Sequence, residues 1–325
     1  METGLYQTLR GKRLRQWQQL LEATGLHTRE QLQETLLIFD GDTLAATGSR
    51  YENVLKCIAV DPAYQGEGLM ATVISHLRQS AFDAGHRHLF LYTKPENANQ
   101  FSSLFFYPIA KTDSVLLLED RKTGIEDFLH SLPEALPGKT AAALVMNCNP
   151  FTLGHRYLIE TAAKNHDAVY VFVLSEPQPP FPAADRLTLV KEGTADLPNV
   201  TVLPTGPYLI SAATFPTYFL KDRDQAEAIH CALDVEIFKK YFVPRFGITH
   251  RYVGTEPGSL LTNSYNQVLK ETLGDTKLVE VPRLCCDGKA ISASTVRSLL
   301  DPFDEEALRK LVPPTTLSYL RSFPR

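Results

Sequence analysis

Cysteine is scarce in this chain, and the few cysteines lack the spacing of a metal site or a disulfide framework. There are 5 in 325 residues, an odd number, and no two of them form a C-x-x-C pair. Cys285 and Cys286 are adjacent, so they would point to opposite faces of a strand. We therefore expect reduced thiols, no metal ligands and a cytoplasmic location.

Long apolar runs and an excess of basic residues are also missing. No stretch approaches the roughly 20 apolar residues that a helix needs to span a bilayer. The basic segment from Arg10 to Arg15 is followed by no apolar core of a signal peptide. The net charge of -4 provides no basic field over the whole chain. We therefore expect neither a membrane nor a nucleic acid among the partners.

The chain has an ordinary globular composition and enough length for two domains. It is 44% hydrophobic and 22% charged, and its 325 residues suffice for two cores. Residues 1–125 predict a mixed α+β domain that begins with an amphipathic helix from Leu5 to Leu21. Strands are expected at 35–39, 44–50, 54–60, 88–92 and 114–118, and helices at 69–84 and 97–106.

Residues 140–325 predict a Rossmann-like α/β domain. Strands are expected at 141–147, 168–174, 199–204, 249–254 and 277–282, and helices at 155–166, 183–195, 222–246, 262–273 and 292–300. Such alternation is typical of a parallel sheet covered on both faces. A closing helical pair is expected at 305–323, and the stretch 126–139 is interpreted as a linker between the domains.

A glycine-containing loop in the first domain indicates a pyrophosphate site. Gln65, Gly66 and Gly68 lie between a predicted strand and a predicted helix, and successive amides of such a loop form an anion-binding nest. The element order and the Gln-x-x-Gly spacing resemble the GNAT acetyltransferase superfamily, in which this loop holds the pyrophosphate of coenzyme A. Met70 departs from the Gly or Ala that is usual there. The alternative is a plain strand–turn–helix with glycines for the turn.

A second anion-binding pattern opens the other domain. The run Thr152-Leu153-Gly154-His155 stands where the first predicted strand of that domain gives way to a helix. Backbone N–H groups at the start of a helix attract phosphate. Gly154 allows the backbone to approach closely, and His155 adds a side-chain donor.

A third pattern late in the chain complements the second one. Ser292, Ser294 and Thr295 place hydroxyls at a predicted helix start, and Arg297 follows one turn later. The early and late motifs together resemble the nucleotidyltransferase superfamily, in which they bind ATP. Two matched motifs at the two ends of one α/β domain are far more specific than either motif alone.

Four further residues are candidates for the same nucleotide site. Arg186 opens a predicted helix and is placed to reach phosphate, with a solvated surface arginine as an equal alternative. Gly254 ends a strand, where ligands bind in open α/β sheets. Asn147 and Asn149 are candidates for binding substrate or ribose, with turn formation before Pro150 as the alternative.

Longer stretches of the chain resemble the citrate lyase ligase family. They are Met146 to Ile159, Lys191 to Asp196, Ala213 to Pro216, Val253 to Pro257, Tyr265-Asn266 and Ile291 to Ser294. The resemblance implies an AMP-forming ligase that uses ATP and Mg²⁺ to activate acetate as acetyl-adenylate. It also implies that His155 and Thr152 assist at the reacting phosphate, while Ser294, Thr295 and Arg297 hold the leaving pyrophosphate.

The resemblance also implies a partner. In this family the acetyl group passes to a thiol on the acyl carrier (gamma) subunit of citrate lyase, which bears a phosphoribosyl-dephospho-CoA group. The loop from Gln65 to Gly68 would then grip the pyrophosphate of that group. Three alternatives remain open: the equivalent acetate ligase for malonate decarboxylase, a cofactor-synthesising adenylyltransferase, and an acetyltransferase that uses acetyl-CoA without ATP.

Overall fold

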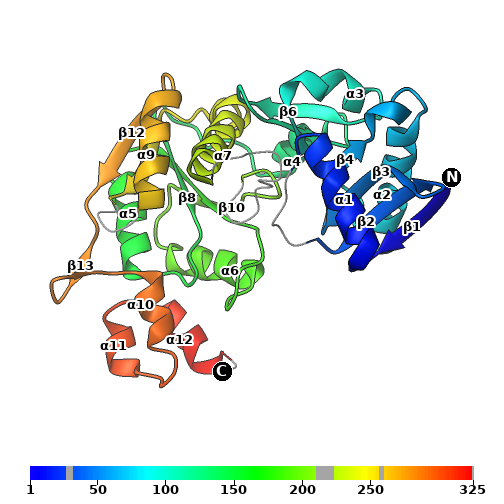
Figure 1. The fold of residues 1–325 in the computed structure, drawn as a ribbon. Helices are drawn as coiled ribbons and strands as arrows, with labels where there is room; N and C mark the ends of the chain where they lie inside the picture. The colour runs from blue at the N-terminus through cyan, green and yellow to red at the C-terminus, as the bar shows by residue number, and fades with distance from the viewer. Residues whose placement is uncertain (27–31, 210–222, 256–259, 324–325) are drawn as a thin grey trace. The chain divides into compact units, whose positions relative to one another are not determined.

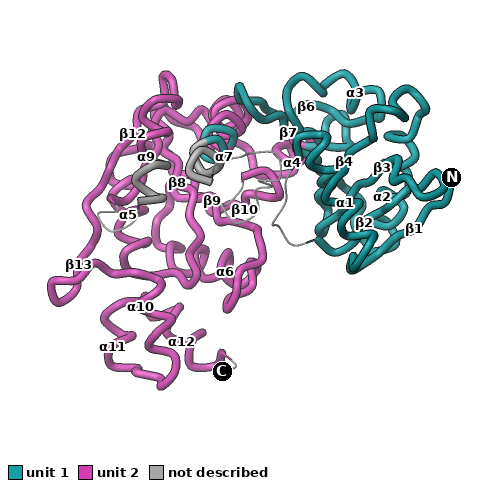
Figure 2. The backbone as a smooth tube through the Cα atoms, in the orientation of Figure 1, with its two compact units in different colours: residues 1–124, 214–233 teal, residues 125–213, 234–325 magenta. Residues whose placement is uncertain are grey.

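The computed structural model describes residues 1–26, 32–209, 223–255 and 260–323 (Figure 1). The chain divides into two compact units, residues 1–124 with 214–233 and residues 125–213 with 234–325 (Figure 2). The domain boundaries expected from the sequence stay a prediction. Residues 125–139 have contacts within the second unit, however, because the Arg245 guanidinium donates to the carbonyls of Leu129 and Leu132 at 3.3 and 3.4 Å.

The first unit is built on a mixed seven-stranded sheet. The strand order is β1-β2-β3-β4-β5-β7-β6, and β4–β5 is the parallel pair among antiparallel neighbours. The strands are β1 (Glu2–Tyr6), β2 (Glu34–Asp40), β3 (Thr43–Tyr51), β4 (Val54–Val60), β5 (Phe90–Thr93), β6 (Tyr107–Lys111) and β7 (Leu116–Glu119). The helices are α1 (Gly11–Ala23), α2 (Leu69–Asp83) and α3 (Ala98–Ser102).

The first unit differs from the sequence-based expectation at two edges of its sheet. The helix predicted from Leu5 begins at Gly11, because residues 2–6 pair with β2 over five positions as strand β1. Strand β6 was not predicted, and its alternation is weak because it contains Pro108 and Lys111. In both places strand pairing across the sheet outweighs local periodicity.

Strands β4 and β5 separate along their length, and this opens the first unit. They pair only where Val54 meets Phe90 and Leu55 meets Leu91, although β4 continues to Val60. The separated halves of the two strands therefore leave backbone groups facing a gap in the sheet. Helix α2 packs on the same sheet, with Val73 among the fully buried side chains of the core.

The second unit is a parallel five-stranded sheet of the doubly wound type. Its order is β10-β9-β8-β11-β12. The strands are β8 (Ala141–Met146), β9 (Ala168–Val173), β10 (Val200–Pro204), β11 (His250–Gly254) and β12 (Lys277–Val281). The chain winds outward from β8 on one side and then returns to β11 on the other. The switch point, where ligands bind in such sheets, therefore lies between β8 and β11.

Helices precede, connect and follow these strands, with one interruption, and residues 223–233 of the third predicted helix are grouped with the first unit. They are α4 (Gly124–Ser131), α5 (Leu153–Ala163), α6 (Ala183–Gly193), α7 (Arg223–Ile237), α8 (Val243–Phe246), α9 (Leu260–Thr272) and α10 (Ala293–Ser298). The single helix predicted at 222–246 is divided by a π-helical segment at Phe238–Phe242. The five predicted strands are confirmed to within about two residues at each end.

Two C-terminal helices, α11 (Glu305–Arg309) and α12 (Pro314–Ser322), brace the start of α5. They form a small apolar cluster with Phe181, Val296, Leu308, Val312, Leu317 and Leu320. The Leu153 amide donates to the Leu311 carbonyl at 2.9 Å, and the Tyr319 hydroxyl donates to Asp185 at 2.5 Å. The C-terminal segment therefore fixes the first turn of α5 by direct contact.

The end of α6 provides a test of this packing. A Cβ at Gly193 would lie 2.5 Å from Cε1 of the fully buried Phe151, whose ring stacks on His155. We expect Gly193→Ala to lower the free energy of unfolding by about 1–3 kcal/mol through overpacking. Urea titration measures this, with Gly254→Ala as control because a methyl there meets nothing within 4 Å. Equal stability of both variants would contradict the prediction.

Candidate functional site

The loop after β8 ends in a reciprocal helix cap. Thr152 is the N-cap of α5, and its hydroxyl accepts from the His155 amide at 3.3 Å. In return, Nδ1 of His155 accepts from the Thr152 amide at 3.1 Å. This capping box satisfies two backbone donors that the start of a helix leaves open. The predicted role of Thr152 thus has a structural component, since its hydroxyl orients the first turn.

The cap also fixes the chemical state of the His155 ring. Because Nδ1 accepts a hydrogen bond from a backbone amide, the ring is the neutral tautomer that carries its proton on Nε2. Burial lowers the pKa of His155 to about 4, and the positive charge of Arg283 contributes to the same shift. At neutral pH His155 is therefore a neutral donor through Nε2–H rather than a cation.

The two sequence motifs of the second unit come together in space. A Cβ at Gly154 would lie 3.3 Å from the backbone oxygen of Ile291, so the absence of a side chain lets α5 approach the late motif. Ser292 caps α10 by accepting from the Thr295 amide at 3.0 Å. Its hydroxyl also lies 2.9 Å from that of Ser294 and 2.8 Å from that of Thr295.

Arg297 links the late motif to the early loop. Its Nη1 donates to the backbone carbonyl of Asn149 at 2.5 Å. The side chain is partly buried between the two motifs. Arg297 therefore fixes the spacing of the site, and its predicted contact with pyrophosphate stays a prediction.

Arg186 lies inside the protein rather than on its surface. It is fully buried, and its guanidinium donates to the backbone and side-chain oxygens of Asn147 and to the carbonyl of Glu176. Burial lowers the pKa of this guanidinium, which remains charged because arginine starts so high. The alternative of a solvated surface arginine is wrong, and Arg186 positions the loop after β8.

The two asparagines of that loop have different surroundings. Asn147 is held by Arg186 and donates to the side-chain oxygen of Gln178. Asn149 is 5% exposed and donates to the Pro179 carbonyl at 3.0 Å. Its Oδ1 is buried, and it has no hydrogen-bond partner among the residues that the structure describes. A ligand donor that reached this oxygen would relieve the cost of an unsatisfied acceptor.

Gly254 stands at the carboxyl end of β11, beside the switch point. The Asn266 amide group lies 3.5 Å from the Gly254 carbonyl. The matched segments Ala213–Pro216 and Glu256–Pro257 lie outside the described residues, as does the side chain of Tyr265. Gly254 thus has the predicted location, and its contact with ATP stays a prediction.

Sequence reasoning missed two charged groups near these motifs. Arg156, next to His155, forms a double hydrogen bond with Asp196 at 3.0 and 2.6 Å, which explains the matched segment that ends in Asp196. Arg283 follows β12 and lies close enough to His155 to affect its pKa. The signal for Arg283 was its place just beyond a strand, at the ligand-binding edge of the sheet.

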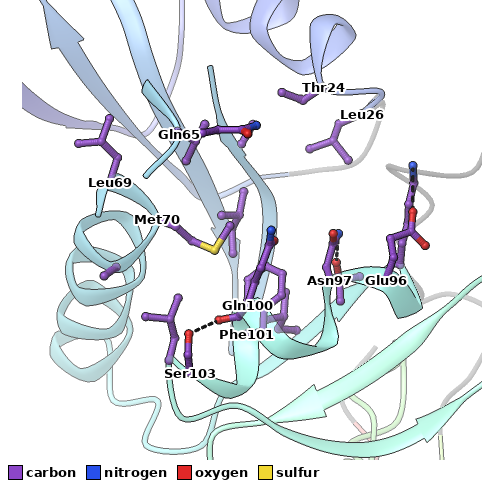
Figure 3. A pocket seen from close by; sticks show the side chains of 18 of the residues that line it. Thr24, Leu26, Gln65, Leu69, Met70, Glu96, Asn97, Gln100, Phe101 and Ser103 are labelled. Carbon is purple, nitrogen blue, oxygen red and sulfur yellow. Dashed lines mark hydrogen bonds and ion pairs between the residues drawn. The ribbon is translucent and has the colours of Figure 1, made fainter. Parts of the chain in front are cut away.

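The loop Gln65–Gly68 borders a cleft in the first unit. The cleft has a volume of about 720 Å³ and lies between the separated strands β4 and β5 and the helices α2 and α3. Gly66 and Gly68 have φ angles of +88° and +76°, which other residues rarely adopt. Figure 3 shows Gln65 at the cleft and Met70 reaching into it from the first turn of α2. These glycines therefore serve the backbone conformation of the loop.

The part of the chain that the structure describes holds neither a metal cluster nor a membrane span. It contains no group of three or more His, Cys, Asp or Glu side chains placed to hold a metal ion. None of its helices has the length and apolar character to cross a bilayer.

Comparison with known proteins agrees with this geometry. The family model of the citrate lyase ligase C-terminal domain matches residues 141–320, and that of the acetyltransferase (GNAT) family matches residues 4–102. Citrate (pro-3S)-lyase ligase of Klebsiella pneumoniae is 42% identical over 85% of this chain and 83% of that protein. The enzyme of the same name from Escherichia coli is 37% identical over 96% of this chain and 91% of that protein. A solved structure, a putative nicotinate-nucleotide adenylyltransferase from Vibrio parahaemolyticus, has 18% identity and a TM-score of 0.37 over 57% of this chain and 99% of that chain.

The family matches and the two sheets define the class as a GNAT-like unit joined to an α/β unit with a doubly wound parallel sheet, which confirms the predicted α/β fold class. Within that class, the chain belongs to the citrate lyase ligase family. It is therefore a ligase, and the use of ATP follows from the family.

The tautomer of His155 is a testable consequence of the capping box. In ¹⁵N-labelled protein without nucleotide, we expect the Nε2–H form throughout pH 6–8, since burial holds the pKa near 4. As the pH falls below about 6.5, the unfolded chain binds the proton first. The free energy of unfolding is then expected to decline until pH 4. Imidazole NMR signals, assigned by their loss in His155→Gln, measure this. A titration midpoint between pH 6 and 7 would contradict the structure.

Proposed function

We propose that this ligase uses ATP and acetate to acetylate the thiol of the prosthetic group on the acyl carrier subunit of citrate lyase. The products are AMP, pyrophosphate and an acetyl thioester, and the reaction activates citrate lyase. The observation that carries the proposal is the contact of Gly154 with Ile291, which unites the two phosphate-binding motifs at the switch point of the sheet. Membership of the citrate lyase ligase family supports the choice of acid and carrier.

The first step forms acetyl-adenylate. A carboxylate oxygen of acetate attacks the α-phosphorus of ATP, and the bond from that phosphorus to the bridging oxygen breaks, so that pyrophosphate leaves. Neutral His155 donates its Nε2–H to a phosphate oxygen as negative charge builds there. The exposed hydroxyls of Ser294 and Thr295 bind the departing phosphates, and Ser292 holds the helix start that carries them. The chain's contribution is mainly positioning and stabilisation of charge.

The second step transfers the acetyl group. The thiol sulfur attacks the acetyl carbonyl carbon, the carbon–oxygen bond to phosphate breaks, and AMP leaves as the thioester forms. The thiol proton passes to solvent or to the phosphate of AMP. No nucleophilic side chain of the protein is required, which agrees with the fully buried state of Cys148, whose thiol pKa is raised by burial.

Mg²⁺ fits this site as a companion of ATP rather than as a resident ion. The described residues offer hydroxyls near the phosphate motifs and no carboxylate cage. Magnesium commonly binds through phosphate oxygens and water with few protein ligands, and when bound with ATP it would supply positive charge for the leaving group.

The cleft of the first unit is proposed to hold the prosthetic arm. Its loop Gln65–Gly68 is bent at two glycines with positive φ, the conformation in which successive amides face an anion. The arm of a phosphoribosyl-dephospho-CoA group contains a pyrophosphate and a pantetheine chain. The loop would bind the first, and the gap between β4 and β5 would receive the second.

One experiment separates this function from its competitors. Incubation of the protein with ATP, acetate and the deacetylated citrate lyase carrier should add a single acetyl mass to the carrier, with AMP as co-product. Mass spectrometry of the carrier measures it, with the malonate decarboxylase carrier in a parallel tube. Acetylation by acetyl-CoA in the absence of ATP, or transfer of AMP to a nucleotide or phosphopantetheine, would overturn the proposal.

Gly68→Val tests whether the loop of the first unit acts in binding the carrier and not in the activation of acetate. A β-branched residue cannot adopt the φ of +76° without strain, so the loop should be distorted. We expect KM for the carrier to rise about tenfold or more, while acetate-dependent ATP–pyrophosphate exchange stays within about twofold.

Gly85→Val is the matched control. Gly85 follows the other end of α2 at a φ of +89°, and a Cβ added at either glycine would meet no atom within 4 Å. The control should leave KM for the carrier unchanged. Equal loss of exchange and transfer in Gly68→Val would refute a carrier-specific role of the loop.

A further inference from the structure

A short hairpin before the late motif has a register fixed by its turn. Strands β13 (Cys285–Cys286) and β14 (Lys289–Ala290) pair antiparallel, with Cys285 opposite Ala290. Asp287 and Gly288 form the two-residue connection, with φ angles of +51° and +75°. Asp-Gly with positive φ at both positions is the preferred sequence of a tight hairpin turn.

The register continues beyond the hairpin toward the site. The Ile291 amide donates to the Leu284 carbonyl at 2.9 Å, so these two residues also face each other. Arg283 precedes Leu284 and Ser292 follows Ile291, so both residues adjoin the last hydrogen-bonded pair of this hairpin.

The first turn of α5 meets the same strand. The contact of Gly154 with the Ile291 carbonyl places the α5 turn beside this part of the chain. An independent sign of proximity is electrostatic, because the charge of Arg283 lowers the pKa of His155. Arg283, His155 and Ser292 therefore converge from three different segments.

Two other arginines near the motifs donate hydrogen bonds to the loops around the site. Arg186 is fully buried among oxygens of Asn147 and Glu176, and Arg297 donates to the Asn149 carbonyl. Arg283 is partly buried, and burial lowers the pKa of its guanidinium. It nonetheless stays charged at neutral pH, as arginine does throughout proteins.

We infer that Arg283 is a catalytic residue that binds the phosphate oxygens of ATP beside His155 and neutralises the charge of the pyrophosphate as it leaves. The inference rests on the proposed ATP-dependent reaction. A guanidinium suits this task because its planar donors match two phosphate oxygens at once. A neutral histidine cannot supply the positive charge, so the two residues have complementary roles.

Arg283→Gln and Arg283→Lys test the inference, with Lys289→Gln as control. Lys289 is an exposed cation of the same hairpin, so its replacement removes equal charge away from His155. We expect Arg283→Gln to reduce the kcat of acetate-dependent ATP–pyrophosphate exchange about 10²–10³-fold, in the range found for a lost transition-state donor. Arg283→Lys should restore part of the lost kcat. The kcat of Lys289→Gln should stay within about twofold of the wild-type value.

Two further measurements do not depend on turnover. The affinity for inorganic pyrophosphate, measured by calorimetry, should fall about tenfold or more in Arg283→Gln and remain in the control. The pKa of His155, measured by NMR, should rise in the same variant because a nearby positive charge is gone.

The role of Arg283 would be overturned if Arg283→Gln matched the wild type in three quantities. These are the rate of exchange, the affinity for pyrophosphate and the pKa of His155. If the wild type binds pyrophosphate through Arg283 but catalyses no exchange with acetate, the proposed acid is wrong while the phosphate role stands. A fall in exchange that Arg283→Lys does not relieve, with pyrophosphate affinity unchanged, would also contradict the inference.

Discussion

The approach of α5 to the backbone of Ile291 is the contact on which the site depends. Residues of the two motifs are separated by more than a hundred positions in the chain, and the glycine at position 154 lets them approach closely, because a Cβ there would lie 3.3 Å from the Ile291 oxygen. A Cβ at this position would require the neighbouring backbone to shift by a few tenths of an ångström. The hydrogen bond from Arg297 to Asn149 holds the same junction from the other side. The phosphate site is therefore a product of close backbone packing.

Around this junction, polar groups are held by other polar groups before any ligand arrives. The capping box fixes the His155 tautomer, and buried Arg186 fixes Asn147. Such preorganisation costs little at the moment of reaction, since donors already face the place where charge develops. Arg186 and Arg297 support the loops in this way, and Arg283 is the further basic residue that we assign to the substrate.

The two units expose backbone groups to ligands in different ways. The parallel sheet does so at the carboxyl ends of β8 and β11, where its winding reverses. The mixed sheet does so by the separation of β4 from β5, next to a loop bent at Gly66 and Gly68. In the function that we propose, the first site would bind the nucleotide and the second would bind the extended arm of the carrier.

The sequence by itself determined the alternation of strands and helices in the second unit and both phosphate motifs. These rest on local signals: apolar periodicity, glycine, and hydroxyls before a helix. The edge strands β1 and β6 could not be predicted from the sequence, because their pairing is decided by neighbours in the sheet. Tertiary structure alone showed that Arg186 is buried and that Arg283 approaches His155. An arginine has the same appearance in a sequence whether it binds a loop or a phosphate, and only the packing around its guanidinium decides which oxygens it meets.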